Sequence, residues 1–379
     1  MKYMGSKRRM LQNGLGELLH TVVPTRNRFF DLFCGTGVVS GFVASRFPVP
    51  VVASDLQQYA VILASSQIEI VKKFNPDKSY DAWIASARKW LIDRDYLVAS
   101  AIKIRPQNSS YQSWRDAVLA CRYECSQLPP EFSLSAAYGG YYFSPSQAVW
   151  FDALRSTLPI ANKKIALAAL IQAASSCAAS PGHTAQPLGL RDEALPHIAA
   201  AWSRDPGTLV HKSLKTSALH SVLVNGKALR SDAVNVASQI SETDIAFIDP
   251  PYSAVQYSRF YHVLEAIAIG KTGQVEGNGR YPPRSERPQS RFCKLTESSL
   301  ALHELLQTIA ATGAQAIITF PAGEASNGLS GAQVEAIAHQ FFRVRTRKIS
   351  SLFSTMGGNE KNRQSHRQIS ELVLHLIAR

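Results

Sequence analysis

The stretch Arg28-Phe-Phe-Asp-Leu-Phe-Cys-Gly-Thr-Gly-Val-Val-Ser40 decides the fold of this chain. Its aromatic, apolar first half leads into a Gly-x-Gly turn, and a run of Ala, Val and Phe residues with helical character follows. The order is therefore strand, tight turn, helix. A short Val-rich run over residues 49–55 ends in an acid, and a second helix is expected over about residues 58–73. Together these elements form a βαβ unit and predict a doubly wound α/β sheet with parallel strands.

Between residues 75 and 219 the sequence changes character. This stretch lacks a series of β-branched strands and carries many aromatic and basic side chains, so we expect a largely helical insert. After it the α/β pattern resumes in a series of further runs: 228–236, 244–252, the helix 297–312, the strand 316–320, and two adjacent final strands over 344–352 and 368–377. The sequence thus predicts one sheet domain, residues 1–74 and 220–379, interrupted by one inserted domain, residues 75–219.

The 379-residue chain carries a formal net charge of +13 at pH 7. Such a surplus of Lys and Arg favours a polyanionic partner, because each phosphate contact releases condensed counterions. A basic surface that binds no polyanion would explain the charge as well. The five cysteines form an odd, sparse set, which is a poor disulfide framework and fits a reducing compartment.

The sequence indicates neither a membrane segment nor a metal site. The N-terminus is basic but lacks the apolar run of a signal peptide, and the apolar stretch 165–179 is interrupted by polar residues. Cys121 and Cys125 stand one helical turn apart, but no second cysteine pair completes a zinc site. We therefore expect no metal and no membrane, and a cytoplasmic protein associated with the nucleoid.

The strongest chemical signal is Asp249-Pro250-Pro251-Tyr252, which directly follows the apolar run Ile-Ala-Phe-Ile. An open α/β sheet binds its ligands beyond the carboxyl ends of its strands. Two consecutive prolines fix the backbone there and leave carbonyl groups that point outward. Asp249 and the Pro250 carbonyl can then accept the two N–H bonds of an amine on a planar heterocycle, while Tyr252 stacks on the ring. An ordinary strand-to-turn element is the alternative, since Asp-Pro commonly starts turns.

A second signal lies in the Gly35-Thr-Gly37 turn that follows Asp31. Glycines allow a ligand to approach the backbone closely at a helix N-terminus. Asp55 closes the next strand, at the place where a ribose-binding acid belongs. The third glycine of the dinucleotide fingerprint is missing, which argues against NAD and favours a cofactor without a pyrophosphate.

In this order the motifs resemble those of the D12 class, or alpha group, of N6-adenine-specific DNA methyltransferases. Lys2-Tyr3-Met4-Gly5-Ser6-Lys7 is similar to the opening motif of the family, residues 31–37 to its methionine-binding loop, and residues 249–252 to its catalytic tetrapeptide. The resemblance implies a Rossmann-like class I sheet that depends on S-adenosylmethionine, mostly parallel with an antiparallel strand near the C-terminus. It also implies that the insert over 75–219 is a target-recognition domain that binds DNA.

The resemblance assigns candidate site residues as well. The catalytic candidates are Asp249, Pro250, Pro251 and Tyr252. The candidates for binding S-adenosylmethionine are Tyr3, Met4, Gly5, Asp31, Phe33, Gly35, Gly37, Asp55 and Asp232. Asp232 corresponds to an acid that contacts the adenine of the cofactor, but Ala233 follows it where the family often has Phe. The candidates for contact with nucleic acid are Lys7, Tyr257 and Arg259; for the last two, simple helix packing explains the sequence equally well.

The implied reaction transfers a methyl group to N6 of an adenine that is rotated out of double-stranded DNA. Hydrogen bonds from the amine to Asp249 and to the Pro250 carbonyl favour a tetrahedral nitrogen, which attacks the methyl group in line. Proteins of a restriction or other defence system are further candidate partners. N4-cytosine methylation in DNA, adenine methylation in RNA, and a catalytically silent DNA-binding protein with the same fold stay open as alternatives.

Overall fold

The computed structural model describes residues 7–70, 72–94, 111–353 and 367–379, and the chain forms two compact units. The helical unit comprises Lys72–Leu219 and Ser258–Arg287. The sheet unit comprises residues 7–70, His220–Tyr257 and Pro288–Arg379. The predicted insert, residues 75–219, falls inside the helical unit, and the segment Ser258–Arg287 belongs to that unit in addition. That the two units serve DNA recognition and catalysis, respectively, stays a prediction.

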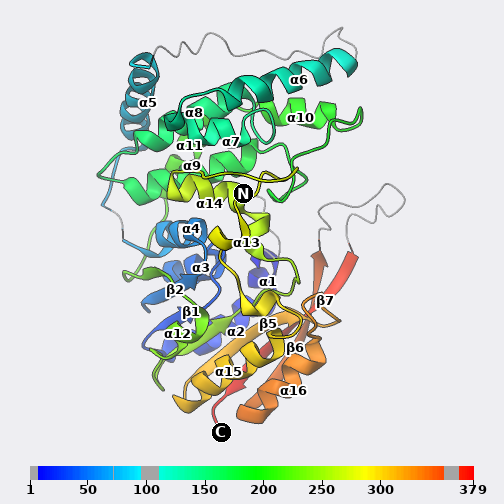
Figure 1. The fold of residues 1–379 in the computed structure, drawn as a ribbon. Coiled ribbons are helices and arrows are strands. Elements are labelled where there is room, and N and C mark those ends of the chain that lie inside the picture. Colours follow the sequence, from blue (N-terminus) through cyan, green and yellow to red (C-terminus); the bar gives the residue numbers. More distant parts are fainter. Residues whose placement is uncertain (1–6, 71, 95–110, 354–366) are drawn as a thin grey trace. The chain divides into compact units, whose positions relative to one another are not determined.

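The sheet unit is built on a seven-stranded sheet in the order β3-β2-β1-β4-β5-β7-β6 (Figure 1). Five strands pair in parallel: β1 (Phe29–Asp31), β2 (Val51–Asp55), β3 (Lys227–Arg230), β4 (Ile245–Ile248) and β5 (Gln315–Pro321). The last two strands, β6 (Arg343–Phe353) and β7 (Arg367–Ile377), run antiparallel to their neighbours. The structure therefore confirms the predicted fold class.

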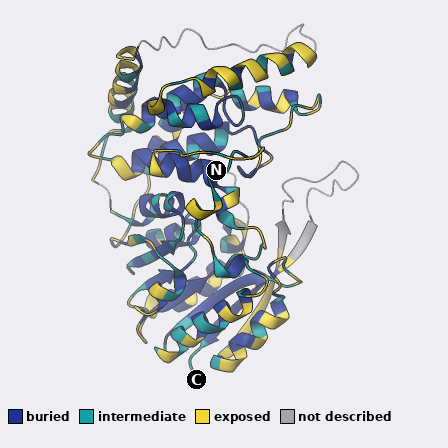
Figure 2. Ribbon diagram, in the orientation of Figure 1, coloured by how far each residue is buried: buried dark blue, intermediate teal, exposed yellow. Residues whose placement is uncertain are grey.

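Helices cover both faces of this sheet, which explains why its central strands are apolar without alternation. On one face Phe29 and Phe247 pack into a cluster with α1 (Arg8–Gln12), α2 (Leu15–Val22), α3 (Val38–Arg46) and α4 (Gln58–Ile68). On the other face Phe30 and Ile248 pack with α12 (Ala233–Ala237), α15 (Ser298–Ala311) and α16 (Gly331–Phe341). Successive residues of β1 and β4 thus serve opposite faces. The buried strands between exposed helix surfaces are visible in Figure 2.

The run over residues 228–236, where the α/β pattern resumes, comprises a strand and a helix. The sequence pattern continues from residue 228 to 236, but β3 stops at Arg230 and the chain turns into helix α12. The cause is Asp232, whose carboxylate accepts a hydrogen bond from the Val234 N–H (2.9 Å) and caps the helix. Residues 233–236 are therefore helical, and their apolar side chains reach the core from a helix instead of a strand.

The helical unit contains eight helices of six residues or more within the part of the chain that the structure describes: α5 (Pro76–Ile92), α6 (Tyr111–Ser126), α7 (Ser133–Tyr138), α8 (Pro145–Ser156), α9 (Lys163–Cys177), α10 (Leu195–Trp202), α11 (Pro206–Ala218) and α14 (His262–Ile269). Helix α9 is buried along most of its length and packs against α11, α8 and α14. Its many alanines allow these close approaches. None of the helices in the described residues is both long and apolar enough to cross a membrane.

Candidate active site

The predicted motif residues meet where the strand order of the sheet reverses. Strands β2 and β3 lie to one side of β1, whereas β4 and the strands that follow it lie to the other. Asp31 is the last residue of β1, Asp55 the last of β2, and Asp249 directly follows β4. Because these strands are parallel, their carboxyl ends share one edge of the sheet, and ligands of open α/β sheets bind at such a reversal point.

Asp249 stands in a buried cluster of charged and polar side chains. Its Oδ1 atom accepts a hydrogen bond from the Thr319 hydroxyl (2.8 Å) and lies 3.0 Å from the Lys7 ammonium. Lys7 Nζ also donates to Glu371 Oε2 (2.9 Å). The side chain of Lys7 is only 5% exposed and that of Asp249 20% exposed. The cation thus bridges two carboxylates, one that directly follows β4 and one on β7.

The topology explains how Glu371 reaches this place. Strand β7 is antiparallel to β5, and Glu371 pairs with Pro321, the last residue of β5. The early residues of β7 therefore lie at the same edge of the sheet as the carboxyl ends of the parallel strands. Thr319 comes from β5 itself, two residues before that end.

Burial and charge act in opposite directions on these groups. Burial raises the pKa of Asp249, the positive charge of Lys7 lowers it, and the negative charge of Glu371 raises it. For Lys7, burial favours the neutral amine, but Asp249 and Glu371 outweigh burial and hold the pKa of the ammonium above its usual value. Lys7 is therefore charged, and it is the cation that compensates Asp249.

The two prolines of the tetrapeptide have different surroundings. The Pro251 carbonyl accepts a hydrogen bond from Asn327 Nδ2 (2.9 Å), which also donates to the Phe292 carbonyl (3.0 Å). Within the described residues, no hydrogen bond to the Pro250 carbonyl is present. Tyr252 is half-buried against the core beside α12 and α15, and burial raises the pKa of its hydroxyl to about 12. The backbone is thus fixed at Pro251, while the Pro250 oxygen keeps its acceptor capacity.

The glycine turn after β1 is held tightly. Asp55 Oδ2 accepts a hydrogen bond from the Gly35 N–H (3.1 Å), and Asp55 Oδ1 accepts one from the Gln57 N–H (2.9 Å). Gly37 has a φ of +72°, and a Cβ atom at this residue would lie 2.7 Å from the Cα of Ala64. Only glycine fits there, because the positive φ and the close helix α4 both exclude a side chain.

Asp31 adds a further buried carboxyl group to this edge. Its Oδ2 accepts a hydrogen bond from the Ser40 hydroxyl (2.5 Å). Burial and the negative charges of Asp249 and Asp55 together raise the pKa of Asp31 to about 7, against the lowering effect of this hydrogen bond. With Glu371, the residues Asp31, Asp55 and Asp249 place four carboxyl groups at this edge of the sheet, which suits a cationic ligand. S-adenosylmethionine, which carries a sulfonium and an ammonium, fits this set of groups.

Of the remaining residues predicted to bind the cofactor, Phe33 and Asp232 lie in the described part of the chain. The Phe33 ring packs edge to face on Phe292, with 5.0 Å between ring centroids. Asp232 is half-buried at the N-terminus of α12. Tyr3, Met4 and Gly5 lie outside the described residues. Among the residues that are described, no group of three or more His, Cys, Asp or Glu side chains could hold a metal ion.

The three residues predicted to contact nucleic acid lie in different surroundings. Lys7 is buried beside Asp249, as described above. Tyr257, half-buried in the sheet unit, begins helix α13 (Tyr257–Phe260). Arg259 is exposed and belongs to the helical unit, where its guanidinium lies 4.6 Å from the centroid of the Tyr281 ring.

Three contributors to the site, Glu371, Thr319 and Asn327, were not predicted as site residues from the sequence. Thr319 was missed, although it is the single hydroxyl residue in the apolar run Ala-Ile-Ile-Thr-Phe, which is a signal that could have identified it. Asn327 lies in a loop, and nothing in the sequence distinguishes it from other polar loop residues. Its side chain is fully buried, and this burial is evident only in the structure.

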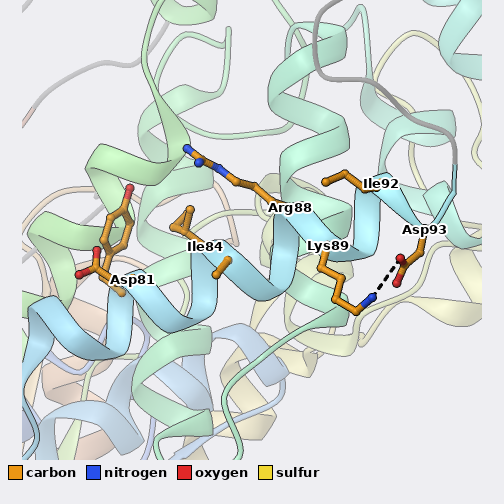
Figure 3. A pocket seen from close by; sticks show the side chains of 8 residues that line it. Asp81, Ile84, Arg88, Lys89, Ile92 and Asp93 are labelled. Carbon is orange, nitrogen blue, oxygen red and sulfur yellow. Dashed lines mark hydrogen bonds and ion pairs between the residues drawn. The ribbon is translucent and has the colours of Figure 1, made fainter.

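A separate hollow lies along helix α5 of the helical unit (Figure 3). All its lining residues come from this one helix, among them Ile84, Arg88 and Ile92, and its volume is about 660 Å³. Lys89 and Asp93 on its wall form an ion pair with each other (3.2 Å). None of the motif residues lines this hollow, so it is distinct from the site at the sheet edge.

Comparison with known proteins identifies a family and several relatives. The model of the family described as D12 class N6 adenine-specific DNA methyltransferase matches residues 3–120 and 202–312. The type II methyltransferase M.FokI of Planomicrobium okeanokoites is 23% identical over 81% of this chain and 42% of its own length. The modification methylase LlaI of Lactococcus lactis subsp. lactis is 23% identical over 72% of this chain and 40% of its own. The chain thus spans about two fifths of the length of these two relatives.

A third relative matches over a shorter stretch. The type II methyltransferase M.CviAII of Paramecium bursaria Chlorella virus 1 is 37% identical over 70 residues, which are 18% of this chain and 20% of the relative.

Proposed function

The chain belongs to the D12 class N6 adenine-specific DNA methyltransferase family, and we propose from this membership and from the geometry around Asp249 that it transfers the methyl group of S-adenosylmethionine to N6 of adenine in DNA. The observation that carries the proposal is the pair of acceptors at the end of β4. Asp249 is held by one of its carboxylate oxygens, and the Pro250 carbonyl accepts no hydrogen bond from the described residues. Two acceptors in adjacent residues suit the two N–H bonds of an exocyclic amine.

The amine needs this environment because its lone pair is delocalised into the adenine ring. Hydrogen bonds to Asp249 and to the Pro250 carbonyl favour a tetrahedral nitrogen with a localised lone pair. The nitrogen then forms its bond to the methyl group while the bond from sulfur to carbon breaks, and Asp249 is the nearest acceptor for the proton that the nitrogen releases. The positioning of both reactants supplies much of the acceleration.

The turn after β1 is the proposed place of the cofactor. S-adenosylmethionine, when bound, supplies an electrophilic methyl group on a positively charged sulfur. Gly35 and Gly37 would let it approach the backbone, while Asp31 and Asp55 would balance its positive charges. The predicted residues Phe33, Asp232, Tyr3, Met4 and Gly5 complete the proposed binding site. Cys34 is buried, and burial raises the pKa of its thiol, so we assign it no nucleophilic role.

Double-stranded DNA is the proposed substrate, with the target adenine rotated into the site because its amine cannot be attacked in line within the stack. A basic cluster in the helical unit supports a polyanionic partner. The guanidinium groups of Arg259 and Arg287 lie 4.6 and 5.5 Å from the centroid of the same ring, that of Tyr281. Burial lowers the pKa of Arg287, and the positive charges of Arg259 and Arg284 lower it further, against the opposing charge of Glu276. Such crowding of positive charge is relieved by a phosphate.

We propose that residues 75–219 act as the target-recognition domain and that residues 1–74 and 220–379 bind the cofactor and catalyse transfer. The relatives are named as type II methyltransferases and a modification methylase. These names support a role in DNA modification beside restriction or other defence proteins, on nucleoid DNA in the cytoplasm.

The test is a product analysis. Purified protein is incubated with labelled S-adenosylmethionine and genomic DNA that lacks adenine methylation, the DNA is digested to nucleosides, and the labelled product is identified by mass spectrometry. We expect N6-methyladenine from the wild type and from the control variant Asp93→Ala, which changes an exposed carboxylate on the helical unit. Asp249→Ala should yield none.

Other products would decide between the alternatives. N4-methylcytosine would keep the fold and the chemistry but change the target base. Label found only in an added RNA substrate would make the protein an RNA methyltransferase. DNA binding without any label transfer would indicate a catalytically silent protein.

A further inference from the structure

The ion pairs of Lys7 do more than neutralise a buried charge, because they leave one oxygen of Asp249 unused. Lys7 and Thr319 both contact Oδ1 of Asp249, at 3.0 and 2.8 Å. No group among the residues that the structure describes donates a hydrogen bond to Oδ2. Within the described part of the chain, the carboxylate is therefore fixed by one oxygen, and Oδ2 is left for a donor from outside these residues.

We propose that Lys7 and Glu371 are positioning residues, which hold Asp249 as an ionised acceptor with Oδ2 reserved for the target amine. The inference rests on the proposed function, since it concerns the same reaction. Lys7 does not touch the substrate in this arrangement. It acts through Asp249, and Glu371 acts through Lys7.

In this arrangement Lys7 keeps the carboxyl group of Asp249 ionised. A carboxyl group that is largely buried tends to take up a proton, and a protonated Asp249 would accept the amine hydrogen bond poorly. Lys7 opposes this protonation at close range. The other groups that face Asp249 are Glu371 from β7, Asp31 from β1, Tyr252 and the neutral Thr319, so Lys7 is the single cation among them.

Glu371 holds the position of Lys7. A lysine side chain has four rotatable carbon bonds, and a single ion pair would leave it several arrangements. The second contact, 2.9 Å to Glu371, fixes the ammonium between Asp249, which follows β4, and Glu371 on β7. Strand β7 reaches this place only through its antiparallel pairing with β5. Glu371 also raises the pKa of Asp249, so its removal should have the opposite electrostatic effect from removal of Lys7.

This arrangement differs from the predicted contact of Lys7 with DNA. The side chain of Lys7 is 5% exposed, and it could reach a phosphate only by giving up both ion pairs. A phosphate contact would weaken DNA binding and lower its salt dependence. A positioning role would change the pH dependence of methyl transfer and leave DNA affinity almost unaltered. The two roles therefore predict different measurements.

The experiment measures the single-turnover rate of N6-adenine methylation between pH 5 and 9, with saturating S-adenosylmethionine and DNA. The variants are Lys7→Met and Glu371→Gln. The matched control is Lys227→Met, which changes the exposed first residue of β3, at the opposite end of the parallel strands from the site. DNA affinity is measured for each protein at two salt concentrations.

We expect opposite shifts of the acidic limb of the rate profile. Asp249 must be ionised to act, so the rate falls as pH falls through its pKa. In Lys7→Met the limb should move to higher pH by at least about one unit, the effect of an opposite charge at such a distance. In Glu371→Gln it should move to lower pH. DNA affinity of both variants should stay within about threefold of the wild type, and Lys227→Met should match the wild type throughout.

A double variant separates positioning from folding, because removal of Lys7 alone leaves two buried carboxylates without a cation. Lys7→Met combined with Glu371→Gln keeps the net charge of the Lys7, Asp249 and Glu371 group unchanged. Its melting temperature should recover towards the wild-type value, while its acidic limb should still lie above that of the wild type, since Lys7 acts on Asp249 more strongly than Glu371 does.

Four results would overturn the inference. The first is a rate loss of equal size at every pH, which indicates a purely structural role. The second is a loss of DNA affinity in Lys7→Met with a lower salt slope, which indicates a phosphate contact. The third is a wild-type protein that methylates no adenine: the proposed function then fails, and the positioning role falls with it. Wild-type activity without any shift in the variants would refute the positioning role alone.

Discussion

Asp249 in the sheet unit and Asp152 in the helical unit are both largely buried carboxyl groups, and burial raises the pKa of each. Their hydrogen bonds differ. Asp152 uses both oxygens at the start of helix α7, where it accepts from the N–H groups of Leu134 (3.0 Å) and Ser135 (2.9 Å) and from the Ser135 hydroxyl (2.6 Å). Among the described residues, contacts to Asp249 are made through one oxygen, Oδ1. A buried carboxyl group that its own fold saturates is structural, whereas one with an unused oxygen is arranged for a ligand.

The largest expected effect is on the rate of methyl transfer, and it distinguishes Asp249 from Asp152. Asp249→Asn should lower the single-turnover rate of methyl transfer by about 10²–10⁴-fold, the usual range for loss of a group that acts on a reacting proton. Cofactor and DNA binding should persist. Asp152→Asn should instead lower the melting temperature and leave the rate per folded molecule near the wild-type value. Equal rate losses in the two variants would contradict the distinction.

The next effect is on the pH dependence of stability, because burial raises the pKa of both Asp31 and Asp152 to about 7. Each folded-state pKa lies above the unfolded value of about 4, so each neutral carboxyl group favours the folded state at low pH. This contribution to stability is lost as pH rises through about 7. Asp31→Asn and Asp152→Asn should each flatten the fall in melting temperature between about pH 4 and pH 8.

The pH dependence of cofactor binding should distinguish Asp31 from Asp152. A cationic ligand beside Asp31 favours its ionised form, so wild-type affinity for S-adenosylmethionine should rise by up to about tenfold from pH 6 to pH 8. Asp31→Asn should remove most of this rise, and Asp152→Asn should retain it. Isothermal titration calorimetry at pH 6 and pH 8 measures the affinity of each protein for S-adenosylmethionine. A rise that persists in Asp31→Asn would mean that another group carries the dependence.

A smaller effect is expected for the basic cluster of the helical unit. Arg259→Ala should weaken DNA binding by several-fold and reduce the slope of log affinity against log salt by about one, since one phosphate contact is lost. The matched control is Arg88→Ala on the exposed face of α5, outside this cluster. The same affinity loss in both variants would indicate a diffuse charge effect and not a contact.

The smallest effect compares one stabilising feature that occurs in both units. Ser144 before α8 and Ser330 before α16 each form a capping box with a glutamine three residues later. The Ser144 box is buried, whereas the hydrogen bonds of the Ser330 box are exposed. Ser144→Ala should destabilise the fold by about 1–2 kcal/mol and Ser330→Ala by about 0.5–1 kcal/mol. Chemical denaturation measures both, and a larger cost at Ser330 would contradict the role of burial.

Much of the sheet unit follows from local sequence patterns. The run before Gly35 and the run before Asp249 both lie in strands, and the final strands form the predicted antiparallel pair. These predictions succeed because strand periodicity, glycine turns and the position of prolines are properties of a few adjacent residues. The run 228–236 was assigned only to the α/β pattern, and the structure divides it between β3 and helix α12, which Asp232 caps.

The arrangement of the site depends on long-range contacts that the sequence does not encode locally. The tetrapeptide Asp249–Tyr252 was recognisable since its four residues are contiguous. The hydrogen bond between Lys7 and Glu371 joins residues 364 positions apart, and it exists only because β7 returns antiparallel along β5. The sequence by itself determined the fold class, the family and the acceptor groups of the site. Tertiary structure alone decided that Lys7 is buried, because burial and charge pairing depend on which distant strands meet at one edge of the sheet.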